Sequence, residues 1–467
     1  MHEQLLTAAR PGRRPVSGHD DPAGELRVFA VQLRIDVTAT VDLATWRAHL
    51  RRAMDELVVP HLVEGRPALV VFPESVGLPA LALGARGASF RERAAAPVPP
   101  PSELPASLLE AMGELAAAYQ PQIMACLQLF GEIDPRALLP LAATDTSVRA
   151  VSLVFSEIAR DYGVYVVAGN AQPRYRESRE RAEVATFGDP ESNDGVAFVP
   201  VEPRVANATF LWAPHEVDPE APSGERNLLF RNEKIPLTDM EHELLALAEG
   251  PDTGDAARRN AGWVEVEGFR VGFATSLPAF AYGYPFGDRP ADLDPFADLR
   301  VSYAAAQDAL GVDVMIQADA NPGPWAAPVA SGAWQPLEWM GSTWRAVADP
   351  TVRFTYNVTP MMTGNLLDLM FDGQSSITSR EHRGVPTRFV GDQAPGPLDP
   401  AEYAVYAGDK AEFLAVAPWV VPDGDRDELM AVTAALAPGS GSPIENGYVE
   451  TAIYADLRRS TTPRVTS

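Results

Sequence analysis

Apolar and amphipathic blocks alternate along most of the chain. The blocks LRVFAVQL (26–33), PALVVFPE (67–74) and VYVVAGN (164–170) are almost continuously apolar and have the length of buried strands. Between them, residues 45–62 and 147–163 carry apolar side chains at helical spacing. Strands and helices that alternate in this way predict an α/β fold with much of its sheet covered on both faces.

The same alternation continues to the end of the chain. Further strands are expected at 208–214, 227–235, 268–275, 312–319, 354–360 and 447–457, and further helices at 298–311 and 337–349. The closely spaced strands between 200 and 235 indicate hairpins, so the sheet is expected to be mixed rather than wholly parallel.

Three segments interrupt this rhythm. Residues 1–25 are polar and rich in proline and glycine, which is typical of a mobile extension. Residues 80–146 contain APVPPPSELP and then an Ala/Leu-rich helical stretch, whereas residues 378–440 are rich in Pro, Gly and Asp. We therefore expect one domain over 26–467, with insertions at 80–146 and 378–440 that shape the mouth of a pocket.

The composition of the chain argues against several classes of function. The formal charge of −25 argues against nucleic acid as a partner, since phosphate binding needs clustered Lys and Arg. The single cysteine and seven scattered histidines predict neither an intrachain disulfide nor a metal site. No apolar run approaches the length of a membrane span, and Arg13 and Arg14 precede no apolar signal segment. A cytoplasmic protein without membrane contact is the expectation.

Three polar residues stand at the ends of expected strands. Glu74 ends ALVVFPE, Lys234 lies in FRNEKIPL, and Ser276 ends RVGFATS. Ligand sites of α/β folds lie at such strand ends, so the three side chains are expected to converge at one edge of the sheet. The alternative for Glu74 is a solvated strand-end carboxylate, although the five apolar residues and the proline before it favour a partly buried place. The alternative for Lys234 is a surface lysine paired with Glu233.

The order Glu, Lys, small nucleophile resembles the nitrilase (carbon–nitrogen hydrolase) superfamily, whose signature is Glu, Lys and Cys in that order. The resemblance covers about residues 26–377 and 446–457. It extends in order through LRVFAVQL, LVVFPE, YGVYVVAGN, VANATFL, NLLFRNEKIPL, VDVMIQADANPGPW, FDGQSSI and GYVETAIYADL. FPE alone is a weak signal, but the ordered set is specific.

The resemblance implies a four-layer αββα sandwich, a homodimer or higher homo-oligomer, no cofactor, and hydrolysis of a non-peptide amide through a covalent acyl intermediate. Glu74 would be the general base and Lys234 the cation that stabilises the oxyanion, with the backbone N–H of Leu277 as a second oxyanion donor. A nitrile hydrolase is an alternative within the superfamily. An N-acyltransferase is disfavoured, because that lipid-modifying role goes with membrane spans.

Two departures from the family pattern concern the nucleophile. Ser276 stands where the family has cysteine, and Pro278 stands where an acid is frequent. A hydroxyl is far harder to deprotonate than a thiol, so a glutamate suited to a thiol is a poor base for serine. Ser276 is therefore either a disabled site or a true change of nucleophile. The competing hypothesis is a catalytically silent binding or regulatory protein.

The residue that supports the lysine is less certain from the sequence pattern. The family often has a second glutamate about eight residues after the lysine. Glu241 and Glu243 lie on either side of that position, and Glu241 is favoured.

Asn321, Trp325 and Tyr282 are candidates for the substrate pocket, although the aromatic residues fit a core or an interface equally well. Trp334, Trp339 and Trp344 fit helix packing. Cys126, apolar on both sides, fits an inert packing residue rather than a nucleophile.

Overall fold

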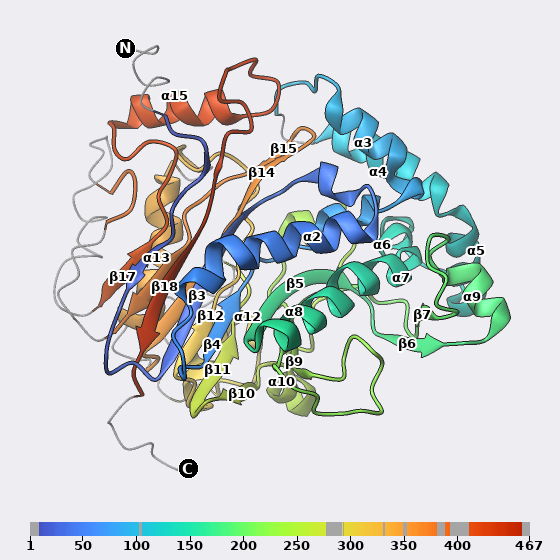
Figure 1. Ribbon diagram of the computed structural model, residues 1–467, viewed down its shortest axis with the longest axis horizontal. Helices are drawn as coiled ribbons and strands as arrows, with labels where there is room; N and C mark the ends of the chain where they lie inside the picture. Colours follow the sequence, from blue (N-terminus) through green and yellow to red (C-terminus); the bar gives the residue numbers. More distant parts are fainter. Residues whose placement is uncertain are drawn as a thin grey trace.

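The computed structural model describes residues 9–101, 105–276, 292, 294–329, 332–348, 353–380, 388–392 and 411–459. Within these residues the chain has a mixed α/β fold with two large sheets and helices outside them (Figure 1). The mixed character agrees with the alternation of strands and helices along the sequence.

The larger sheet contains three parallel strands, followed by two antiparallel pairings. Strand β3 pairs with β4 and β4 with β5, all parallel, while β5–β8 and β8–β9 are antiparallel as the hairpin pattern predicts. Antiparallel β18 lies on the other side of β3. The bounds are β3 Leu26–Arg34, β4 Ala68–Val71, β5 Tyr165–Gln172, β8 Ala206–Trp212, β9 Leu228–Glu233 and β18 Val449–Leu457.

Short strands extend this sheet beyond β18 and β3. In the N-terminal stretch, β1 (Gly12–Arg13) and β2 (Ser17–His19) pair in parallel with β18. The hairpin of β14 (Met362–Leu366) and β15 (Leu369–Phe371) attaches through β14 to β3. A separate small hairpin joins β6 (Tyr175–Ser178) to β7 (Ala197–Pro200).

The second sheet contains the strand that leads to Ser276. Its strands are β10 Trp263–Val266, β11 Phe269–Phe273, β12 Val314–Ile316, β13 Tyr356–Thr359, β16 Ser376–Ser379 and β17 Glu412–Val416. Strands β11, β12 and β13 are parallel neighbours, and the remaining pairs are antiparallel. Parallel neighbours place the carboxyl ends of β11 and β12 side by side.

Helices lie outside the sheets, and α2 (Leu43–Ala53) continues through η2 (Met54–Val58) and η3 (Val59–His61). In the described part of the chain, no single helix is long and apolar enough to cross a membrane. Within the described residues, one pair of helical segments, Pro135–Ala142 and Thr144–Tyr162, is long and apolar enough when taken together, and the two segments are bent by 52° at the break between them. The helix bounds are α2 Leu43–Ala53, α3 Ala88–Ala95, α4 Ala106–Ala118, α5 Gln120–Phe130, α6 Leu138–Ala142, α7 Thr144–Ser147, α8 Val154–Tyr162, α9 Arg181–Phe187, α10 Gly254–Asn260, α12 Leu299–Ala309, α13 Gln335–Ala348 and α15 Arg426–Leu436.

One apolar cluster joins the two large sheets. It contains Val28, Leu69 and Val167 from the larger sheet. Val271 and Ile316 from the smaller sheet belong to the same cluster. The two sheets therefore share a core, which brings the strand ends of one close to those of the other.

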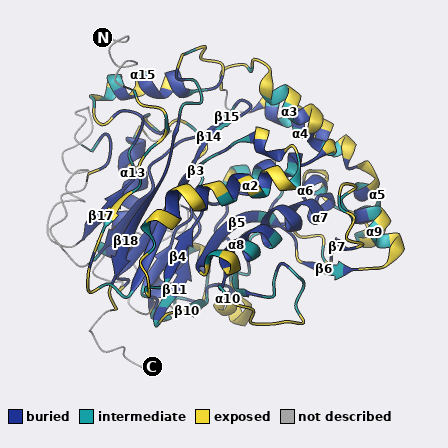
Figure 2. Ribbon diagram, viewed as in Figure 1, coloured by how far each residue is buried: buried dark blue, intermediate teal, exposed yellow. Residues whose placement is uncertain are grey.

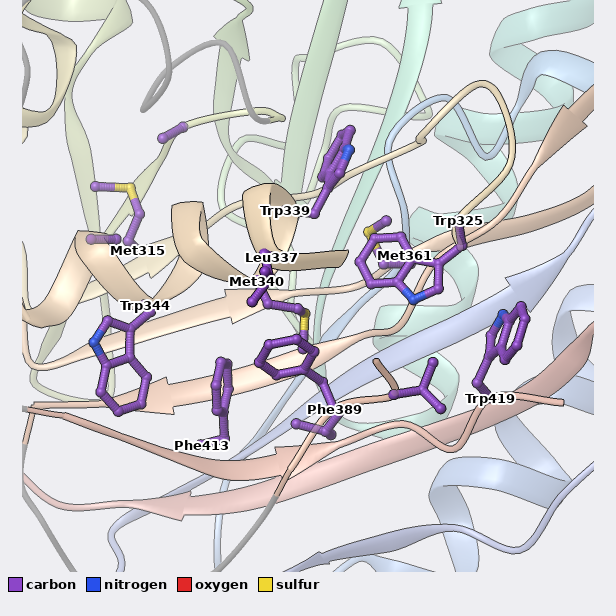
Figure 3. Close-up of a cluster of buried hydrophobic side chains, with 14 of the residues drawn as sticks. Met315, Trp325, Leu337, Trp339, Met340, Trp344, Met361, Phe389, Phe413 and Trp419 are labelled. Carbon is purple, nitrogen blue, oxygen red and sulfur yellow. The ribbon is translucent and has the colours of Figure 1, made fainter. Parts of the chain in front are cut away.

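Two further clusters attach helices to the outer faces of the sheets. Trp46 on α2 and Phe155 on α8 pack with Phe29 and Val70 of the larger sheet. Figure 2 shows α2 buried along one side and exposed along the other, as expected for an amphipathic helix. The second cluster packs α12, α13 and α15 with the smaller sheet and is rich in Trp and Met (Figure 3).

The expected insertion at 80–146 forms a helical layer of its own. Its helices α3 and α4 pack with the β14–β15 hairpin in a separate apolar cluster. Asp368, between β14 and β15, accepts hydrogen bonds from the backbone N–H groups of Ser107 and Leu108 in the first turn of α4. A carboxylate at a helix N-terminus satisfies N–H groups that have no partner in the helix.

Candidate active site

Glu74 and Lys234 are in direct contact, and Ser276 is linked to Glu74 through the 318–320 segment, but the three residues do not end strands of a single sheet as the sequence suggested. Glu74 follows β4 and Lys234 follows β9, both in the larger sheet, whereas Ser276 follows β11 in the smaller sheet. The expectation failed because the sequence pattern gives strands without saying which sheet each one joins. The site lies where the ends of the two facing sheets meet.

Glu74 is buried, with 3% of its surface exposed. Its Oε1 accepts hydrogen bonds from Lys234 Nζ at 2.8 Å and Asn207 Nδ2 at 2.6 Å, and its Oε2 accepts one from the backbone N–H of Ala320 at 3.2 Å. Burial and the nearby Glu241 raise the pKa of this carboxyl, although Lys234 opposes the shift. A carboxylate with a raised pKa is suited to accepting and returning a proton.

The backbone around Glu74 is tightly constrained. Ser75 has a φ of 53°, in the left-handed region that few side chains adopt. A Cβ at Gly169 on β5 would lie 3.1 Å from the Glu74 Cα and 3.1 Å from the Ser75 N. Glycine at 169 thus allows β5 to approach the turn that carries Glu74.

Lys234 lies between two carboxylates. Its Nζ is 2.8 Å from Glu74 Oε1 and 2.8 Å from Glu241 Oε2, and only 2% of the side chain is exposed. Burial alone would lower the pKa of the ammonium, but Glu74 and Glu241 together outweigh burial and raise that pKa. Lys234 is therefore a fixed positive charge.

Of the two glutamates that the sequence left open, Glu241 is the one that contacts the lysine. It lies in the π-helical turn η8 (Met240–Leu244), and its Oε2 also accepts hydrogen bonds from the backbone N–H and hydroxyl of Thr238. Burial opposes ionisation of Glu241, but Lys234 outweighs it and lowers the pKa of the carboxyl. Glu243, in the same turn, is exposed.

Asn207 on β8 was not identified from the sequence. Its Nδ2 donates to Glu74 Oε1 at 2.6 Å and to Glu241 Oε1 at 2.5 Å, while its backbone carbonyl accepts from the Lys234 N–H at 2.8 Å. One amide therefore bridges both carboxylates and fixes the backbone of the lysine. The available signal was an asparagine inside the apolar strand VANATFL, because a buried amide requires partners.

Ser276 is buried and has an unusual backbone conformation, with a φ of 67°. Its N–H donates to the Ala318 carbonyl at 2.9 Å, so the chain after β11 still runs beside the chain after β12. Two residues further on, Ala320 binds Glu74 through its N–H. Non-glycine residues with positive φ are uncommon and concentrate at functional sites.

A second contact joins the Ser276 turn to the larger sheet. The hydroxyls of Thr275 and Thr209 are 2.8 Å apart, and both groups are buried. Thr209 is two residues after Asn207 on β8, so both side chains point to the same face of that strand. The turns that carry Glu74, Lys234 and Ser276 are thus linked by hydrogen bonds across the two sheets.

The remaining pocket candidates are placed differently. Asn321 is buried and donates from Nδ2 to the Asp372 carbonyl at 2.9 Å. Trp325 is buried in the Trp- and Met-rich cluster, together with Met361 and Trp419 (Figure 3). Leu277 and Tyr282 lie outside the described residues.

The other residues considered from the sequence have packing roles. Trp334, Trp339 and Trp344 belong to the same Trp- and Met-rich cluster, in agreement with the helix-packing prediction. Cys126 on α5 is buried in a separate apolar cluster. Burial raises the pKa of the Cys126 thiol to about 12, which keeps it protonated near neutral pH and poorly nucleophilic.

These contacts indicate which chemical steps the side chains of the site can carry out. Glu74 can hold a proton, and Lys234 supplies a charge that is already in place before any reaction. Ser276 offers a hydroxyl at a strained turn that hydrogen-bonds to the same 318–320 segment as Glu74. A base, a fixed cation and a hydroxyl at neighbouring strand ends are the groups that acyl transfer requires.

No protein-family profile matches the chain, and no curated protein matches it. Among solved structures, a cysteine-to-alanine mutant of Nesterenkonia AN1 amidase from the nitrilase superfamily is similar, with 13% identity over 77% of this chain and 84% of that chain and a TM-score of 0.39. An amidase from Nesterenkonia sp. has 13% identity over 77% and 84% of the two chains and a TM-score of 0.38.

Proposed function

We propose that this protein is a carbon–nitrogen hydrolase-like amidase that acts on a non-peptide amide through Glu74, Lys234 and the residue at position 276. The observation that carries the proposal is the buried Lys234 ammonium, which lies 2.8 Å from the carboxylates of both Glu74 and Glu241. Burying three ionisable groups together is costly, and functional sites are where such arrangements concentrate.

In the acylation step, the side chain at position 276 attacks the carbonyl carbon of the amide while Glu74 accepts its proton. The carbonyl oxygen becomes an oxyanion, and the Lys234 ammonium stabilises it. Glu74 then returns the proton to the amide nitrogen. The carbon–nitrogen bond breaks, ammonia or an amine leaves, and the acyl group remains bonded to position 276.

Water completes the reaction. Glu74 accepts a proton from a water molecule, whose oxygen attacks the acyl carbon. The second tetrahedral intermediate collapses, the bond to position 276 breaks, and the protonated side chain is restored. The products are a carboxylic acid and the free enzyme, and no redox step is involved. Asn207 and Glu241 are positioning residues that hold Glu74 and Lys234 throughout.

A second candidate function follows from the serine itself. A serine hydroxyl next to a single carboxylate is a weak nucleophile, because no histidine belongs to the set of residues described above. The alternative is a binding or regulatory protein that holds amides in the same pocket without turning them over. In either case the protein with Ser276 is expected to be impaired relative to a variant with a thiol at position 276.

The proposal includes the finer architecture implied by the resemblance. We propose a four-layer αββα arrangement for one domain over 26–467, with insertions at 80–146 and 378–440. We further propose a homodimer or larger homo-oligomer, a cytoplasmic location and an amide, or alternatively a nitrile, as the small-molecule substrate.

The test is ammonia release from a panel of primary amides by the unaltered chain and by Ser276→Cys, with Ser276→Ala as the matched control. We expect measurable turnover by Ser276→Cys, little or none by the unaltered chain, and none by Ser276→Ala. Turnover by the unaltered chain comparable with that of Ser276→Cys would identify a true serine nucleophile. Absence of turnover and of any acyl adduct in both forms would contradict the hydrolase function.

A further inference from the structure

A cavity of about 640 Å³ lies at the edge of the larger sheet, beside β9 and α10. Four arginines and two glutamates line it, so the lining carries a formal charge of +2 in a chain whose total is −25. Small-molecule sites typically have volumes of roughly 300–1,000 Å³, so the cavity can hold a whole small molecule. The charged residues of the lining are Arg174, Arg204, Arg231, Arg259, Glu233 and Glu249.

The cavity lies on the outer face of the larger sheet. Arg231 and Glu233 are two residues apart on β9, so their side chains point to the same face of that strand. The Arg231 guanidinium lies over the ring of Phe210, which belongs to the cluster that packs α2 and α8 onto this sheet. Asn232, between them, points the other way and donates to the Tyr303 hydroxyl at 3.0 Å. The cavity is therefore separate from the core that the two sheets share.

Three of the arginines converge on one buried carboxylate. Glu233 is 2% exposed and accepts a hydrogen bond from Arg174 Nη2 at 3.1 Å. Arg204 Nη2 and Arg231 Nε each lie 3.5 Å from oxygens of the same carboxylate. The neighbouring Glu202 is 3.7 Å from Arg174 and 3.9 Å from Arg204, beyond hydrogen-bonding distance. One carboxylate thus faces more positive charge than it can neutralise.

Two of the arginines have hydrogen-bond donors to spare. The Arg231 side chain is only 8% exposed, and its Nη atoms donate to the carbonyls of Gln172 and Pro173. Its buried Nε has no hydrogen-bond partner. Arg259 on α10 is exposed, and its side chain forms no hydrogen bond or ion pair within the described residues. Since a buried donor without a partner is costly, a ligand that supplies an acceptor here would be favoured.

Glu249 does little to offset this positive charge. Its Oε2 already accepts a hydrogen bond from Arg300 Nε at 2.7 Å, and Arg300 does not line the cavity. Arg204 donates to the backbone carbonyl of Glu249 at 2.8 Å, not to its carboxylate. The Arg204 guanidinium therefore keeps its charge available to the cavity.

The wall of the cavity is held by backbone contacts. Asn260 accepts a hydrogen bond from the Glu233 N–H at 2.8 Å and donates one to the Glu233 carbonyl at 2.8 Å. The Gly250 N–H donates to the Lys234 carbonyl at 3.1 Å, and a Cβ at Gly250 would lie 2.5 Å from the Glu233 carbonyl oxygen. The segment that carries Glu249 thus packs closely on the end of β9. A preformed wall reduces the ordering cost of binding.

We propose that this cavity binds a phosphorylated small molecule, specifically a phosphate monoester. The planar fork of N–H groups in arginine suits phosphate and carboxylate oxygens. A phosphate monoester is favoured because its charge approaches −2 near neutral pH, which matches the lining. Its three terminal oxygens can accept from three separate elements: Arg174 follows β5, Arg204 precedes β8, and Arg259 lies on α10. The site goes beyond the proposed hydrolysis and does not depend on it.

Isothermal titration calorimetry of the full chain, in a low-salt buffer without phosphate, tests the ligand class. The probes are glycerol 3-phosphate, ribose 5-phosphate and adenosine 5′-monophosphate, each compared with the alcohol that lacks the phosphate. We expect at least one monoester to bind and the three alcohols not to bind. Inorganic phosphate and succinate, a dicarboxylate, are expected to bind at least tenfold more weakly than that monoester.

Arg259→Gln and Arg174→Gln test the location of the site. Each is expected to weaken binding of the monoester about tenfold, which is the scale of one lost charge-assisted hydrogen bond. Arg258→Gln is the matched control, because Arg258 is the exposed neighbour of Arg259, lies over the ring of Phe296 and does not line the cavity. Its affinity is expected to be unchanged. Thermal unfolding of each variant without ligand checks that it is folded.

The outcomes decide the proposal without reference to hydrolysis. A monoester whose binding is weakened by Arg259→Gln and Arg174→Gln but not by Arg258→Gln would establish the site. Absence of binding by all three monoesters at millimolar concentration would overturn it, and so would equal losses in the three variants. Inorganic phosphate or succinate that binds as tightly as the best monoester would overturn the assignment to a phosphate monoester.

Discussion

At Lys234, burial and two neighbouring carboxylates have opposite effects on the charge state of the ammonium. Taking an ammonium out of water favours its neutral form, but two carboxylates at 2.8 Å favour the charged form and prevail. Removing one partner of a buried ion pair typically costs about 3–5 kcal/mol, because the remaining charge is left uncompensated. The positions of Glu74 and Glu241 are therefore part of what keeps Lys234 buried and cationic.

Glu241→Gln tests this dependence. In the Ser276→Cys background, kcat/KM is expected to fall about tenfold or more, because a neutral amide holds the ammonium less firmly and small displacements of a catalytic group are costly. The free energy of unfolding, measured by urea denaturation, is expected to fall by about 1–3 kcal/mol, less than for an isolated pair, because Glu74 still balances the charge of Lys234.

The matched control is Glu243→Gln, two residues away in the same turn and exposed. Its unfolding free energy is expected to stay within about 0.5 kcal/mol of the parent and its activity to be unchanged. Equal losses in the two variants would contradict the assignment of Glu241 as the residue that positions the lysine.

At the residue scale, the sequence predicted the members of the site that end strands, but not those inside them. Glu74, Lys234 and Ser276 stand out because a polar residue follows an apolar run. Asn207 lies within a strand, where its partners come from residues 133 positions earlier and 34 positions later. Spacing alone also left Glu241 and Glu243 open, because the direction of a side chain in a π-helical turn depends on its local geometry.

At the element scale, apolar strands, including the short strands β4 and β12, and the helices around α2 and α8 were predictable, whereas several other short strands were not. The expected strand at 26–33 corresponds closely to β3, and the expected helix at 147–163 to the consecutive helices α7, η7 (Val148–Leu153) and α8. Strands β10, β15 and β16 have three or four residues and were not expected, since so short a run shows little periodicity, even though β10 and β15 pair with the strands next to them in the chain. The sequence also did not predict which sheet each strand joins, because periodicity carries no information on strand pairing.

Gly169 offers a test of how β5 supports the Glu74 turn. In Gly169→Ala the new methyl group would lie 3.1 Å from two backbone atoms of residues 74 and 75, so the turn must shift by a few tenths of an ångström. We expect a loss of unfolding free energy of about 1–3 kcal/mol and, in the Ser276→Cys background, a reduced kcat.

Gly113→Ala is the control for this change. Gly113 is an exposed position inside α4, and a Cβ there meets nothing within 4 Å. Alanine is the better helix former, so this variant is expected to be more stable by up to about 1 kcal/mol with unaltered activity. A Gly169→Ala protein that behaves like Gly113→Ala would show that β5 does not constrain the glutamate.

At the scale of the whole molecule, two sheets that share one core hold the site between their ends. Glu74 and Lys234 belong to one sheet and Ser276 to the other, so the site depends on how the sheets pack. The same arrangement buries Asp372, whose Oδ1 accepts hydrogen bonds from Trp419 Nε1 at 3.0 Å and the Gly373 N–H at 2.9 Å. Burial raises the pKa of the Asp372 carboxyl to about 7, although these donors oppose the shift.

Asp372 predicts a pH dependence of global stability. Between about pH 4 and pH 7 the folded protein keeps a proton on Asp372 that the unfolded chain has lost, so stability falls as pH rises through this window. The loss attributable to this group is on the order of 4 kcal/mol.

Urea unfolding at pH 4.5 and at pH 7.5 checks this sign. Asp372→Asn, which cannot ionise, is expected to lose less stability than the parent over that range. The exposed Asp423→Asn is expected to follow the parent. A parent and an Asp372→Asn protein with parallel pH profiles would contradict the prediction.

The most direct test of the central claim is the covalent adduct itself. Ser276→Cys, mixed with an aliphatic amide and quenched in acid during turnover, is expected to gain the mass of one acyl group, located by peptide mapping at position 276. Lys234→Met in the same background is expected to reduce the adduct strongly, and Ser276→Ala to abolish it. An acyl group on Cys126, or no adduct under conditions in which the amide binds, would contradict the account.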